Sequence, residues 1–395
     1  MRHYQIIIVS MAKISGPAFR AKSFARVITA SVMACVCAFS RFGAASADAA
    51  GRTFDAFEAY PPIYASAESS AEPLGLTPQQ VKAVYNLPST GGSGTIAVID
   101  AYDSPGIEGD LAAFDKKFSL QACTIANKCL EVHPMGASSR KDAGWAMETA
   151  LDVEWAHAIA PKAKILLIES TGGSGSALMR AVDYARERQD VIAVSMSWGG
   201  PEFDGEAELD SHFKADHPVV FTASSGDDGA GASWPAVSPA VIAVGGTSLS
   251  LDPKGKLISE KAWSGSGGGV SGQEAEPAFQ AGYSIPRAAG KRAVPDVAYA
   301  ADPAHGFSVY HDKGWSVVGG TSAGAPQWAA IASLAAQKKD PVSLPKLYAD
   351  KAGASYTKFF RDITSGKNGD CAYYCAARKH YDYITGLGSP VTYRF

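Results

Sequence analysis

Short apolar runs alternate with amphipathic stretches along the middle of the chain, between about residues 95 and 245. The apolar runs are continuous in Val, Ile and Ala, which is typical of parallel strands buried on both faces of a sheet. The stretches between them have the spacing of amphipathic helices. This alternation predicts right-handed βαβ units in one α/β domain, with a doubly wound parallel sheet and flanking helices. The predicted strands are residues 95–100, 164–169, 191–195, 219–223 and 241–244, and the predicted helices are residues 78–87, 107–118, 145–159, 176–188 and 206–215.

One strand-to-helix junction, residues 317–327 (VVGGTSAGAPQ), places a serine where the chain changes direction. The apolar run 315–318 ends in two glycines, and an alanine-rich helical segment begins at residue 327. Ser322 therefore comes where a helix begins, and there unpaired N–H groups and the positive end of the helix dipole favour a developing oxyanion. This setting suits a nucleophile. Serine is also a common helix N-cap, so the stretch alone leaves both interpretations open.

The first 75 residues differ in composition from the predicted domain that follows them. The first fifty residues carry several basic residues but no Asp or Glu before Asp48, an apolar run at 27–39, and the small-residue triplet Ala45-Ser46-Ala47. This layout predicts a secretory signal peptide over residues 1–47, with Met11 as an alternative start. Residues 48–75 are small, polar and Pro-containing, and we expect a linker or loose N-terminal arm. The folded domain is expected over residues 76–395, with hairpins and cleft-lining loops in the Gly-rich stretch 250–315.

The composition narrows the class of protein. The chain has 395 residues, of which 46% are hydrophobic and 19% charged, with a net charge of -3. These values are those of a folded globular protein, and no basic run suggests nucleic-acid binding. No later segment is apolar enough to span a membrane. We therefore expect an exported monomer, secreted or periplasmic, without a nucleic-acid partner.

Four cysteines remain beyond the predicted signal peptide, as two close pairs: Cys123 with Cys129, and Cys371 with Cys375. An even number of cysteines in an exported chain predicts two short-loop disulfides. Zinc binding is the alternative. However, the spacings C-x5-C and C-x3-C, in two pairs that lie far apart in the sequence, fit the usual zinc patterns poorly.

Acidic residues stand out at two places. Glu148 and Asp152 are four residues apart and share one face of a predicted apolar helix. If they share a proton, the pKa of one carboxyl rises and the pair can relay protons, whereas the alternative is a solvated helix face. Asp227 and Asp228, in FTASSGDDG, follow a predicted strand at the sheet edge where ligands bind in doubly wound folds. The alternative for them is an ordinary Asp-Gly turn.

Taken together and in this order, the motifs resemble the sedolisin family of serine-carboxyl peptidases, relatives of subtilisin. The G-T-S-x-x-x-P stretch of that family is matched by residues 320–326, its glutamate and aspartate by Glu148 and Asp152, and its S-G-D stretch by residues 225–227. The resemblance runs from about residue 76 to residue 395 and implies a subtilisin-like fold. The segments that resemble the substrate-cleft segments of the family are Ser197, Trp198 and Gly199, and Ser266, Gly267, Gly268 and Gly269.

The resemblance implies a role for each catalytic candidate. Glu148 is expected to take the proton of Ser322, as histidine does in other serine peptidases. Asp152 is expected to orient Glu148 and share its proton, and a protonated Asp227 to donate a hydrogen bond to the oxyanion. Because one carboxyl works protonated and another as a base, we expect peptide or protein substrates to be cleaved with an acidic pH optimum, by endopeptidase or tripeptidyl-peptidase action.

The C-terminal stretch resembles the calcium site of the same family, which implies one structural calcium ion. Asp362 and Asp382 would supply carboxylates, and Ile363 a carbonyl oxygen. The family has glycines at the two positions that here hold Arg378 and His380; their carbonyls remain candidate ligands, although Arg378 adds positive charge. The alternative is a pair of ordinary loop aspartates.

Two departures from related families affect the expectations. Sedolisin-like enzymes usually carry a large folded pro-segment, whereas here a short arm, residues 48–75, separates the predicted signal from the domain. A subtilisin proper needs a histidine in an H-G-T-H-like stretch, and neither His133 nor His157 has that setting. Asp100, which ends the strand TIAVID much as a subtilisin aspartate would, is therefore interpreted as structural or at the cleft edge.

Two rival functions remain. Residues 320–324 also fit the G-x-S-x-G pattern of α/β-hydrolase esterases, and Asp362 and His380 follow Ser322 in the order of a triad. That interpretation leaves only a short chain after Ser322 for the rest of its sheet, and it leaves Glu148 without a role. The other rival is an exported, non-catalytic binding protein.

Overall fold

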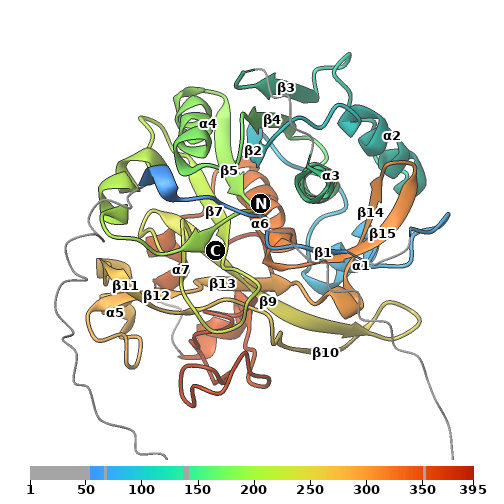
Figure 1. The fold of residues 1–395 in the computed structure, drawn as a ribbon. Coiled ribbons are helices and arrows are strands. Elements are labelled where there is room, and N and C mark those ends of the chain that lie inside the picture. The colour runs from blue at the N-terminus through green and yellow to red at the C-terminus, as the bar shows by residue number, and fades with distance from the viewer. Residues whose placement is uncertain (1–53, 66–68, 137–141, 350–352) are drawn as a thin grey trace, which may run out of the picture. The chain divides into compact units, whose positions relative to one another are not determined.

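An eight-stranded sheet occupies the centre of the part of the chain that the computed structural model describes, residues 54–65, 69–136, 142–349 and 353–395 (Figure 1). Neighbouring strands follow the order β10-β9-β7-β5-β2-β4-β3, and β13 pairs with β9 off this path. All pairs are parallel except β9 with β10, which run antiparallel. The strands are β2 (Thr95–Ala101), β3 (Leu130–Pro134), β4 (Lys164–Ser170), β5 (Val191–Met196), β7 (Val220–Ser224), β9 (Val241–Leu251), β10 (Leu257–Ala262) and β13 (Val297–Ala300).

Strand β2 explains why the sheet needs helices on both faces. All seven of its residues are buried. Ile96 and Val98 pack into one core with α3 and α6, while Ala97 and Ile99 pack into a second core with α4. Figure 1 shows α3 end-on between α2 and the central strands. The α-helices are α1 (Pro78–Val84), α2 (Ile107–Phe118), α3 (Ala143–Ile159), α4 (Gly175–Glu187), α5 (Ala278–Tyr283), α6 (Gly324–Gln337) and α7 (Leu344–Tyr348).

The remaining strands form four smaller sheets, and short 3-10 helices lie between them. A three-stranded sheet has the order β1-β15-β14, and three two-stranded sheets pair β11 with β12, β16 with β17, and β6 with β8. The strands are β1 (Tyr64–Ala65), β6 (Gly200–Pro201), β8 (Ser233–Trp234), β11 (Gly269–Ala275), β12 (Lys291–Val294), β14 (Phe307–His311), β15 (Gly314–Gly319), β16 (Phe360–Arg361) and β17 (Ser389–Pro390). The 3-10 helices are η1 (Phe54–Ala56), η2 (Glu206–Phe213), η3 (Pro303–His305), η4 (Thr321–Ala323) and η5 (Gly353–Lys358).

The predicted fold class is confirmed, with differences at individual elements. The α-helix expected at residues 206–215 is instead the 3-10 helix η2, in which only Glu206 and Phe213 are buried. Strand β3 was not predicted, because its sequence LEVHP is half polar and its middle residues are only partly buried. No helix in the described part of the chain is long and apolar enough to cross a membrane. The predicted signal peptide, residues 1–47, lies outside the described residues.

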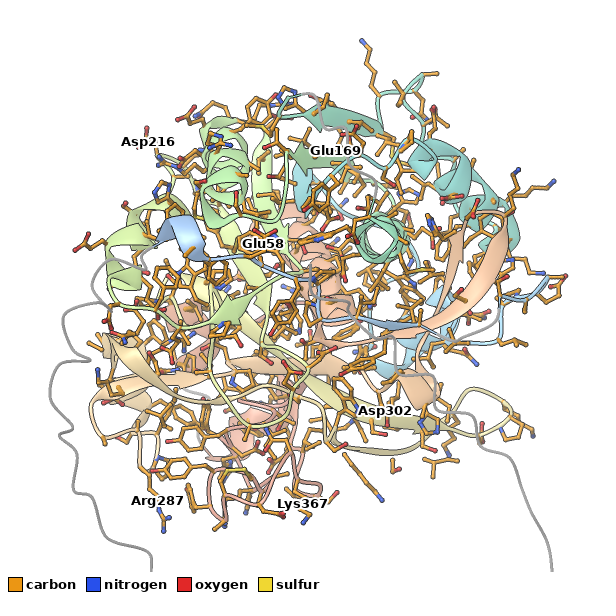
Figure 2. The ribbon with its side chains drawn as sticks, viewed as in Figure 1. Glu58, Glu169, Asp216, Arg287, Asp302 and Lys367 are labelled. Atoms are coloured by element: carbon orange, nitrogen blue, oxygen red, sulfur yellow. A yellow bond between two sulfur atoms is a disulfide. The ribbon has the colours of Figure 1, made fainter. Side chains whose placement is uncertain are left out.

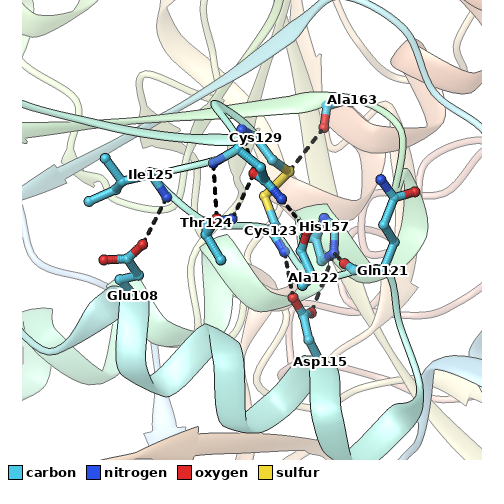
Figure 3. Close-up of a disulfide and its surroundings, with 11 residues drawn as sticks. Glu108, Asp115, Gln121, Ala122, Cys123, Thr124, Ile125, Cys129, His157 and Ala163 are labelled. Atoms are coloured by element: carbon cyan, nitrogen blue, oxygen red, sulfur yellow. Dashed lines mark hydrogen bonds and ion pairs between the residues drawn. A yellow bond between two sulfur atoms is a disulfide. The ribbon is translucent and has the colours of Figure 1, made fainter.

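Both predicted disulfides are present, Cys123–Cys129 and Cys371–Cys375. The first lies against His157 of α3 (Figure 3), which is fully buried together with Glu154. The sequence leaves open whether these two side chains meet solvent or satisfy local hydrogen bonds, and the structure shows the second: Glu154 accepts a hydrogen bond from the N–H of Tyr310. Nε2 of His157 lies 2.8 Å from the carbonyl oxygen of Gln121 and 3.3 Å from Oδ1 of Asp115. Burial lowers the pKa of His157 to about 4, so at neutral pH this is a neutral ring and not an ion pair.

Candidate active site

The carboxyl ends of the central parallel strands bring several polar side chains to one edge of the sheet. Strand β2 ends next to Asp100, β5 is followed by Ser197, and β7 is followed by the loop that holds Asp227. All three residues are buried. This is the edge at which ligands bind in doubly wound folds.

Ser322 lies at the same edge, in the turn between β15 and α6. Strand β15 ends at Gly319, the 3-10 turn η4 contains Ser322, and α6 begins at Gly324. The predicted strand-to-helix junction is therefore confirmed, although β15 belongs to the small three-stranded sheet. The N-cap residues of η4 and α6 are Gly320 and Ala323, so Ser322 is the N-cap of neither helix. Its Oγ lies 3.5 Å from the carbonyl oxygen of Ser197.

Glu148 and Asp152 lie one turn apart on α3, and both are fully buried. The N-terminus of this helix is fixed by Asp142, whose side chain accepts hydrogen bonds from two backbone N–H groups of the first turn. Oγ of Ser197 lies 2.9 Å from Oδ1 of Asp152 and 3.2 Å from the carbonyl oxygen of Ser322. Ser197 therefore connects the carboxyl pair to the serine, and a solvated helix face is excluded.

The electrostatics of this pair follow from its burial. Desolvation raises the pKa of Glu148 well above its usual value, and the nearby carboxyls of Asp152 and Asp100 raise it further. The Ser322 hydroxyl is close enough to act in the opposite direction, although neither Glu148 oxygen forms a hydrogen bond of regular geometry. Burial likewise raises the pKa of Asp152, and Asp100 adds to it. The group therefore retains protons over a wide pH range.

Asp100 is a member of this group that sequence reasoning did not place there. Both of its oxygens are buried without a hydrogen bond of regular geometry. Burial raises its pKa to about 7, opposed by the hydroxyl of Thr149 on α3. The signal in the sequence was an aspartate at the end of a buried strand, which alone does not reveal the facing helix.

Asp227, in the loop after β7, contacts Thr321, the residue directly before Ser322. Its Oδ1 accepts hydrogen bonds of 2.8 Å from both the backbone N–H and the hydroxyl of Thr321. Its Oδ2 is buried and has no partner. Burial raises the pKa of Asp227 to about 8, against the effect of the Thr321 bonds. At acidic pH this carboxyl is therefore protonated, and its second oxygen can donate a hydrogen bond.

The first predicted substrate segment borders the site in part. Ser197 contacts the carboxyl pair, and the backbone of Gly199 pairs with Tyr60. The indole of Trp198 is fully buried in the core, where its N–H donates to the carbonyl of Ile99. Its side chain therefore does not reach the cleft.

The second predicted segment, Ser266 to Gly269, braces the loop that carries Asp227. The N–H of Gly267 donates to the carbonyl of Gly226, and Gly268 and Gly231 exchange two backbone hydrogen bonds. The Ser266 hydroxyl lies 3.0 Å from the carbonyl oxygen of Ile384, away from the serine. The backbone of this segment therefore holds the loop of Asp227 in place, and its one side chain, that of Ser266, does not.

The segment that we expected to be a linker or loose arm is bound to the domain in its described residues, 54–65 and 69–75. Its backbone N–H at Ala59 donates to Gly173, and its carbonyl at Phe57 accepts from Gly175. Figure 1 shows this blue segment crossing between α4 and β15, and Figure 2 labels Glu58, which bridges to Ser174 just before α4. The arm therefore runs along the same edge as Ser322.

The predicted calcium ligands gather in the C-terminal loop. Asp362 accepts a hydrogen bond from the N–H of His380, and Asp382 accepts one from the N–H of Arg378. His380 has a φ of 67°, so its backbone keeps a conformation that favours glycine. The Arg378 guanidinium lies 4.2 Å from the ring centre of Tyr373.

Asp382 is a buried carboxyl without a charged partner. It is 1% exposed, its oxygens accept bonds only from backbone N–H groups and the Thr385 hydroxyl, and no cationic side chain in the described chain pairs with it. Burial raises its pKa to about 6. Uncompensated buried charge next to the Asp362 carboxyl and backbone carbonyls fits a calcium ion.

The esterase triad is not assembled. His380 contacts Asp362 through its backbone and Tyr356 through its ring, with ring centres 5.2 Å apart. In the described chain the hydrogen bonds of Ser322 reach Ser197 and not a histidine. The order of residues in the sequence therefore suggested a triad that the fold does not form.

The chain is similar to several known peptidases. A profile of the subtilase family matches residues 140–351. Kumamolisin from Bacillus sp. (strain MN-32) is 33% identical over 370 residues, which cover 82% of this chain and 64% of kumamolisin. Sedolisin from Pseudomonas sp. (strain 101) is 30% identical over 229 residues, covering 50% of this chain and 39% of sedolisin. The chain thus spans less than two thirds of the length of either relative.

A solved structure supports the fold comparison. The structure of Pseudomonas sedolisin, a serine-carboxyl proteinase complexed with two molecules of pseudo-iodotyrostatin, matches with a TM-score of 0.70 at 24% identity. The match covers 81% of this chain and 96% of that chain. Sphericase matches with a TM-score of 0.54 at 17% identity over 81% of this chain and 98% of that chain. Both share the same architecture around a parallel sheet.

Proposed function

The chain belongs to the subtilase family and, within it, to the sedolisins, and on this premise we propose that it is a serine-carboxyl peptidase with Ser322 as its nucleophile. The observation that supports this most is the convergence of Ser322, the buried carboxyl pair of α3 and Asp227 at one sheet edge. No histidine is hydrogen-bonded to Ser322 in the described chain, so a carboxylate is the available base.

The carboxyl pair supplies the proton transfers. Oγ of Ser322 attacks the peptide carbonyl carbon while Glu148 takes the hydroxyl proton, and Asp152 holds Glu148 and shares that proton. When the tetrahedral intermediate collapses, Glu148 returns the proton to the leaving amine, and an ester of Ser322 remains. Water then attacks the ester with Glu148 again as the base. Ser197 keeps Asp152 in position through its 2.9 Å contact.

Asp227 stabilises the oxyanion. Its Oδ1 is held by Thr321, which leaves the unpartnered Oδ2 as the oxygen that carries the proton and donates it. Because burial raises the pKa of this carboxyl to about 8, the donor is present at acidic and neutral pH and is lost as the pH rises through that value. The loss of the donor above this pKa limits activity at alkaline pH. The acidic optimum itself is proposed from the resemblance of the sequence motifs to those of the sedolisins.

Endopeptidase action is favoured over tripeptidyl-peptidase action. The arm lies along the sheet edge from Phe57, beside Gly175, to Tyr64, beside Gly319. An extended chain thus fits on both sides of Asp227, with more than three residues before it. A site that removes tripeptides needs a block at that distance.

Digestion of a peptide library between pH 3 and pH 9 tests the proposed activity. Wild type is expected to cut internal bonds fastest at acidic pH, while Ser322→Ala and Glu148→Ala cut none above background. An esterase would keep its turnover in Glu148→Ala. If wild type cuts no peptide at any pH, the protein is a binding protein and the proposal is wrong.

We also propose that Asp362 and Asp382, with the carbonyls of Ile363, Arg378 and His380, hold one structural calcium ion. The ion would compensate the charge of the buried Asp382 carboxylate and of the half-buried Asp362 carboxylate. Calcium is expected to raise the melting temperature of wild type, and a chelator to lower it, with Asp382→Asn insensitive to both. The melting temperature is measured by scanning calorimetry on the inactive Ser322→Ala chain. If calcium and the chelator shift the melting temperature of Asp382→Asn as much as that of its parent, the proposed calcium site is wrong.

Export is the last part of the proposed function. Two disulfides are compatible with an oxidising compartment, and the acidic optimum proposed above suits a protein released from the cell or held in a periplasm. Fractionation of the native host, followed by N-terminal sequencing of the recovered protein, tests both export and removal of residues 1–47.

A further inference from the structure

The loop that follows α2 brings two cysteines against a histidine of α3 (Figure 3). A ring nitrogen of His157 and the sulfur atoms of Cys123 and Cys129 all lie within 4.8 Å of one another. His157 and Cys123 are fully buried, and Cys129 is partly exposed. In the part of the chain that the structure describes, this is the only group of three or more His, Cys, Asp or Glu side chains close enough to share a metal ion.

The hydrogen bonds of His157 determine which of its ring nitrogens is free to bind a metal. Nε2 lies 2.8 Å from the carbonyl oxygen of Gln121, and a carbonyl only accepts, so Nε2 carries the proton. Nδ1 then has the lone pair, and it is buried without a hydrogen-bond partner among the described residues. A histidine that binds a metal usually donates from its other nitrogen to a carbonyl or a carboxylate. Gln121 supplies the carbonyl here, and Oδ1 of Asp115 lies 3.3 Å from the same nitrogen.

The cysteine loop is also held in place by hydrogen bonds that do not depend on the disulfide. At one end, the N–H of Cys123 donates to Oδ2 of Asp115 over 2.9 Å. At the other end, the N–H of Cys129 donates to Oδ1 of Asn127 over 3.0 Å. Both bonds use backbone N–H groups, so breaking the S–S bond leaves them intact. We therefore expect the two sulfur atoms to stay beside His157 after reduction.

We propose that Cys123, Cys129 and His157 form a zinc site in the chain whose Cys123–Cys129 disulfide is reduced. Zinc bonds are about 2.3 Å long to sulfur and about 2.0 Å long to nitrogen, so the ligand atoms of a tetrahedral site lie about 3.5–4 Å apart. The ring nitrogen is already within 4.8 Å of both sulfur atoms, and these move apart once their bond is broken. The site does not depend on the proposed peptidase function.

Reduction and metal binding are two separate steps. A dithiol reductant gives two electrons and two protons to the Cys123–Cys129 bond and is itself oxidised to a disulfide. Each of the two cysteine thiols then releases its proton as it binds the zinc ion. Two thiolates, a neutral imidazole and a zinc ion have no net charge together, which suits a buried position. The loop is thus closed by zinc in a reducing compartment and by the disulfide in an oxidising one.

Protection of the thiols tests the site directly. The Ser322→Ala chain is reduced with a phosphine, freed of the reductant without air, and alkylated with iodoacetamide in the presence or absence of one equivalent of zinc. Zinc is expected to slow the alkylation of Cys123 and Cys129 about ten-fold or more, because a bound thiolate is not free to react. Mass spectrometry of the digested chain measures each cysteine.

The second cysteine pair is the internal control for this experiment. Cys371 and Cys375 belong to no group of metal-binding side chains in the described chain, so their alkylation is expected to be equally fast with and without zinc. Unprotected Cys123 and Cys129, or equal protection of both pairs, would show that the proposed site is wrong.

His157→Gln separates metal binding from packing. Glutamine can keep the hydrogen bond to the carbonyl of Gln121, but it has no nitrogen lone pair. In the reduced chain, the affinity for zinc is expected to fall by about 100-fold, at least as much as loss of an outer partner of a metal ligand causes. Competition with a chromophoric chelator measures the affinity. His212→Gln is the matched control, because the Nδ1 of His212 already pairs with Asp183 at 2.8 Å. If His157→Gln and His212→Gln bind zinc equally well, His157 is not a ligand and the proposal fails.

The melting temperature shows whether the site belongs to the folded chain. With calcium present throughout, zinc is expected to raise the melting temperature of reduced Ser322→Ala and to leave that of the oxidised chain unchanged. A reduced chain that folds only when zinc is added gives the same support, because the free energy of metal binding then becomes free energy of folding. If zinc leaves the reduced chain unchanged, or shifts the oxidised chain by the same amount, these cysteines do not hold the ion and the proposal is overturned.

Discussion

At the scale of single residues, the site is a set of buried carboxyls that differ in their partners. Asp227 has two bonds from Thr321 to one oxygen and none to the other, so it is suited to donate when protonated. Glu148 has a like-charged neighbour on its own helix and the Ser322 hydroxyl facing it. Burial is the largest cause that raises both pKa values, and the hydrogen-bond partners decide which carboxyl accepts a proton and which donates one.

Replacing Asp227 separates hydrogen-bond donation from charge. Asp227→Ala removes the donor and is expected to lower kcat by about 10²- to 10³-fold. Asp227→Asn keeps a neutral donor at every pH, so it is expected to retain more activity than the alanine variant. It should also lack the fall in kcat that wild type shows as the pH rises through about 8. Initial rates across pH measure both effects, and an unchanged alkaline limb in Asp227→Asn would contradict the oxyanion role.

At the scale of elements, periodicity predicted most of what positions the site. Continuous apolar runs predicted β2, β4, β5, β7 and the start of β9, because strands buried on both faces need no polar positions. The glycines and the helical run around Ser322 predicted its strand-to-helix junction. The same reasoning missed β3 and the short parallel strand β13, since a half-polar or very short strand has no distinctive period.

Contacts between distant elements were beyond sequence reasoning. Asp100 joins the carboxyl group only because β2 faces α3, and the arm binds only because two loop edges leave unpaired backbone groups. His157 is buried because the disulfide loop lies against it, which its place on the helix alone does not reveal. Such features depend on which elements become neighbours, and residue spacing along one element carries no information about that.

Helix α2 offers a test of local propensity. Gly109 lies in this helix, is exposed, and has open space where a methyl group would be added. Gly109→Ala is therefore expected to increase the free energy of unfolding by about 0.5–1 kcal/mol, because alanine loses less backbone entropy in a helix. Denaturant unfolding of the Ser322→Ala chain with and without this change measures the difference. A destabilised variant would mean that α2 is not helical at this position.

At the scale of the whole molecule, buried carboxyls determine how stability depends on pH. In the described part of the chain, burial raises the pKa to about 7 or 8 at five carboxyls: Asp100, Asp115, Glu206, Asp227 and Glu274. The folded state therefore holds protons that the unfolded chain has already released, and stability falls as the pH rises through these values. The pKa of His157 is lowered to about 4, so below the ordinary pKa of histidine this side chain makes stability rise with pH. One such group is outweighed by the five carboxyls.

The melting temperature is accordingly expected to decrease steadily from pH 5 to pH 8. Scanning calorimetry on Ser322→Ala, which prevents self-digestion, is the measurement. Asp115→Asn is a useful comparison, because it removes one raised carboxyl outside the proposed active site and should flatten the slope. A melting temperature that rose from pH 5 to pH 8 would mean that these carboxyls are not buried as described.

The central claim is that a glutamate activates Ser322, and the kcat of Glu148→Gln at acidic pH tests it most directly. The variant keeps the size of the side chain but cannot accept the serine proton. In this variant kcat is expected to fall by about 10⁴-fold or more, close to the loss in Ser322→Ala. A Glu148→Gln enzyme that kept a tenth or more of the parent kcat would contradict the account.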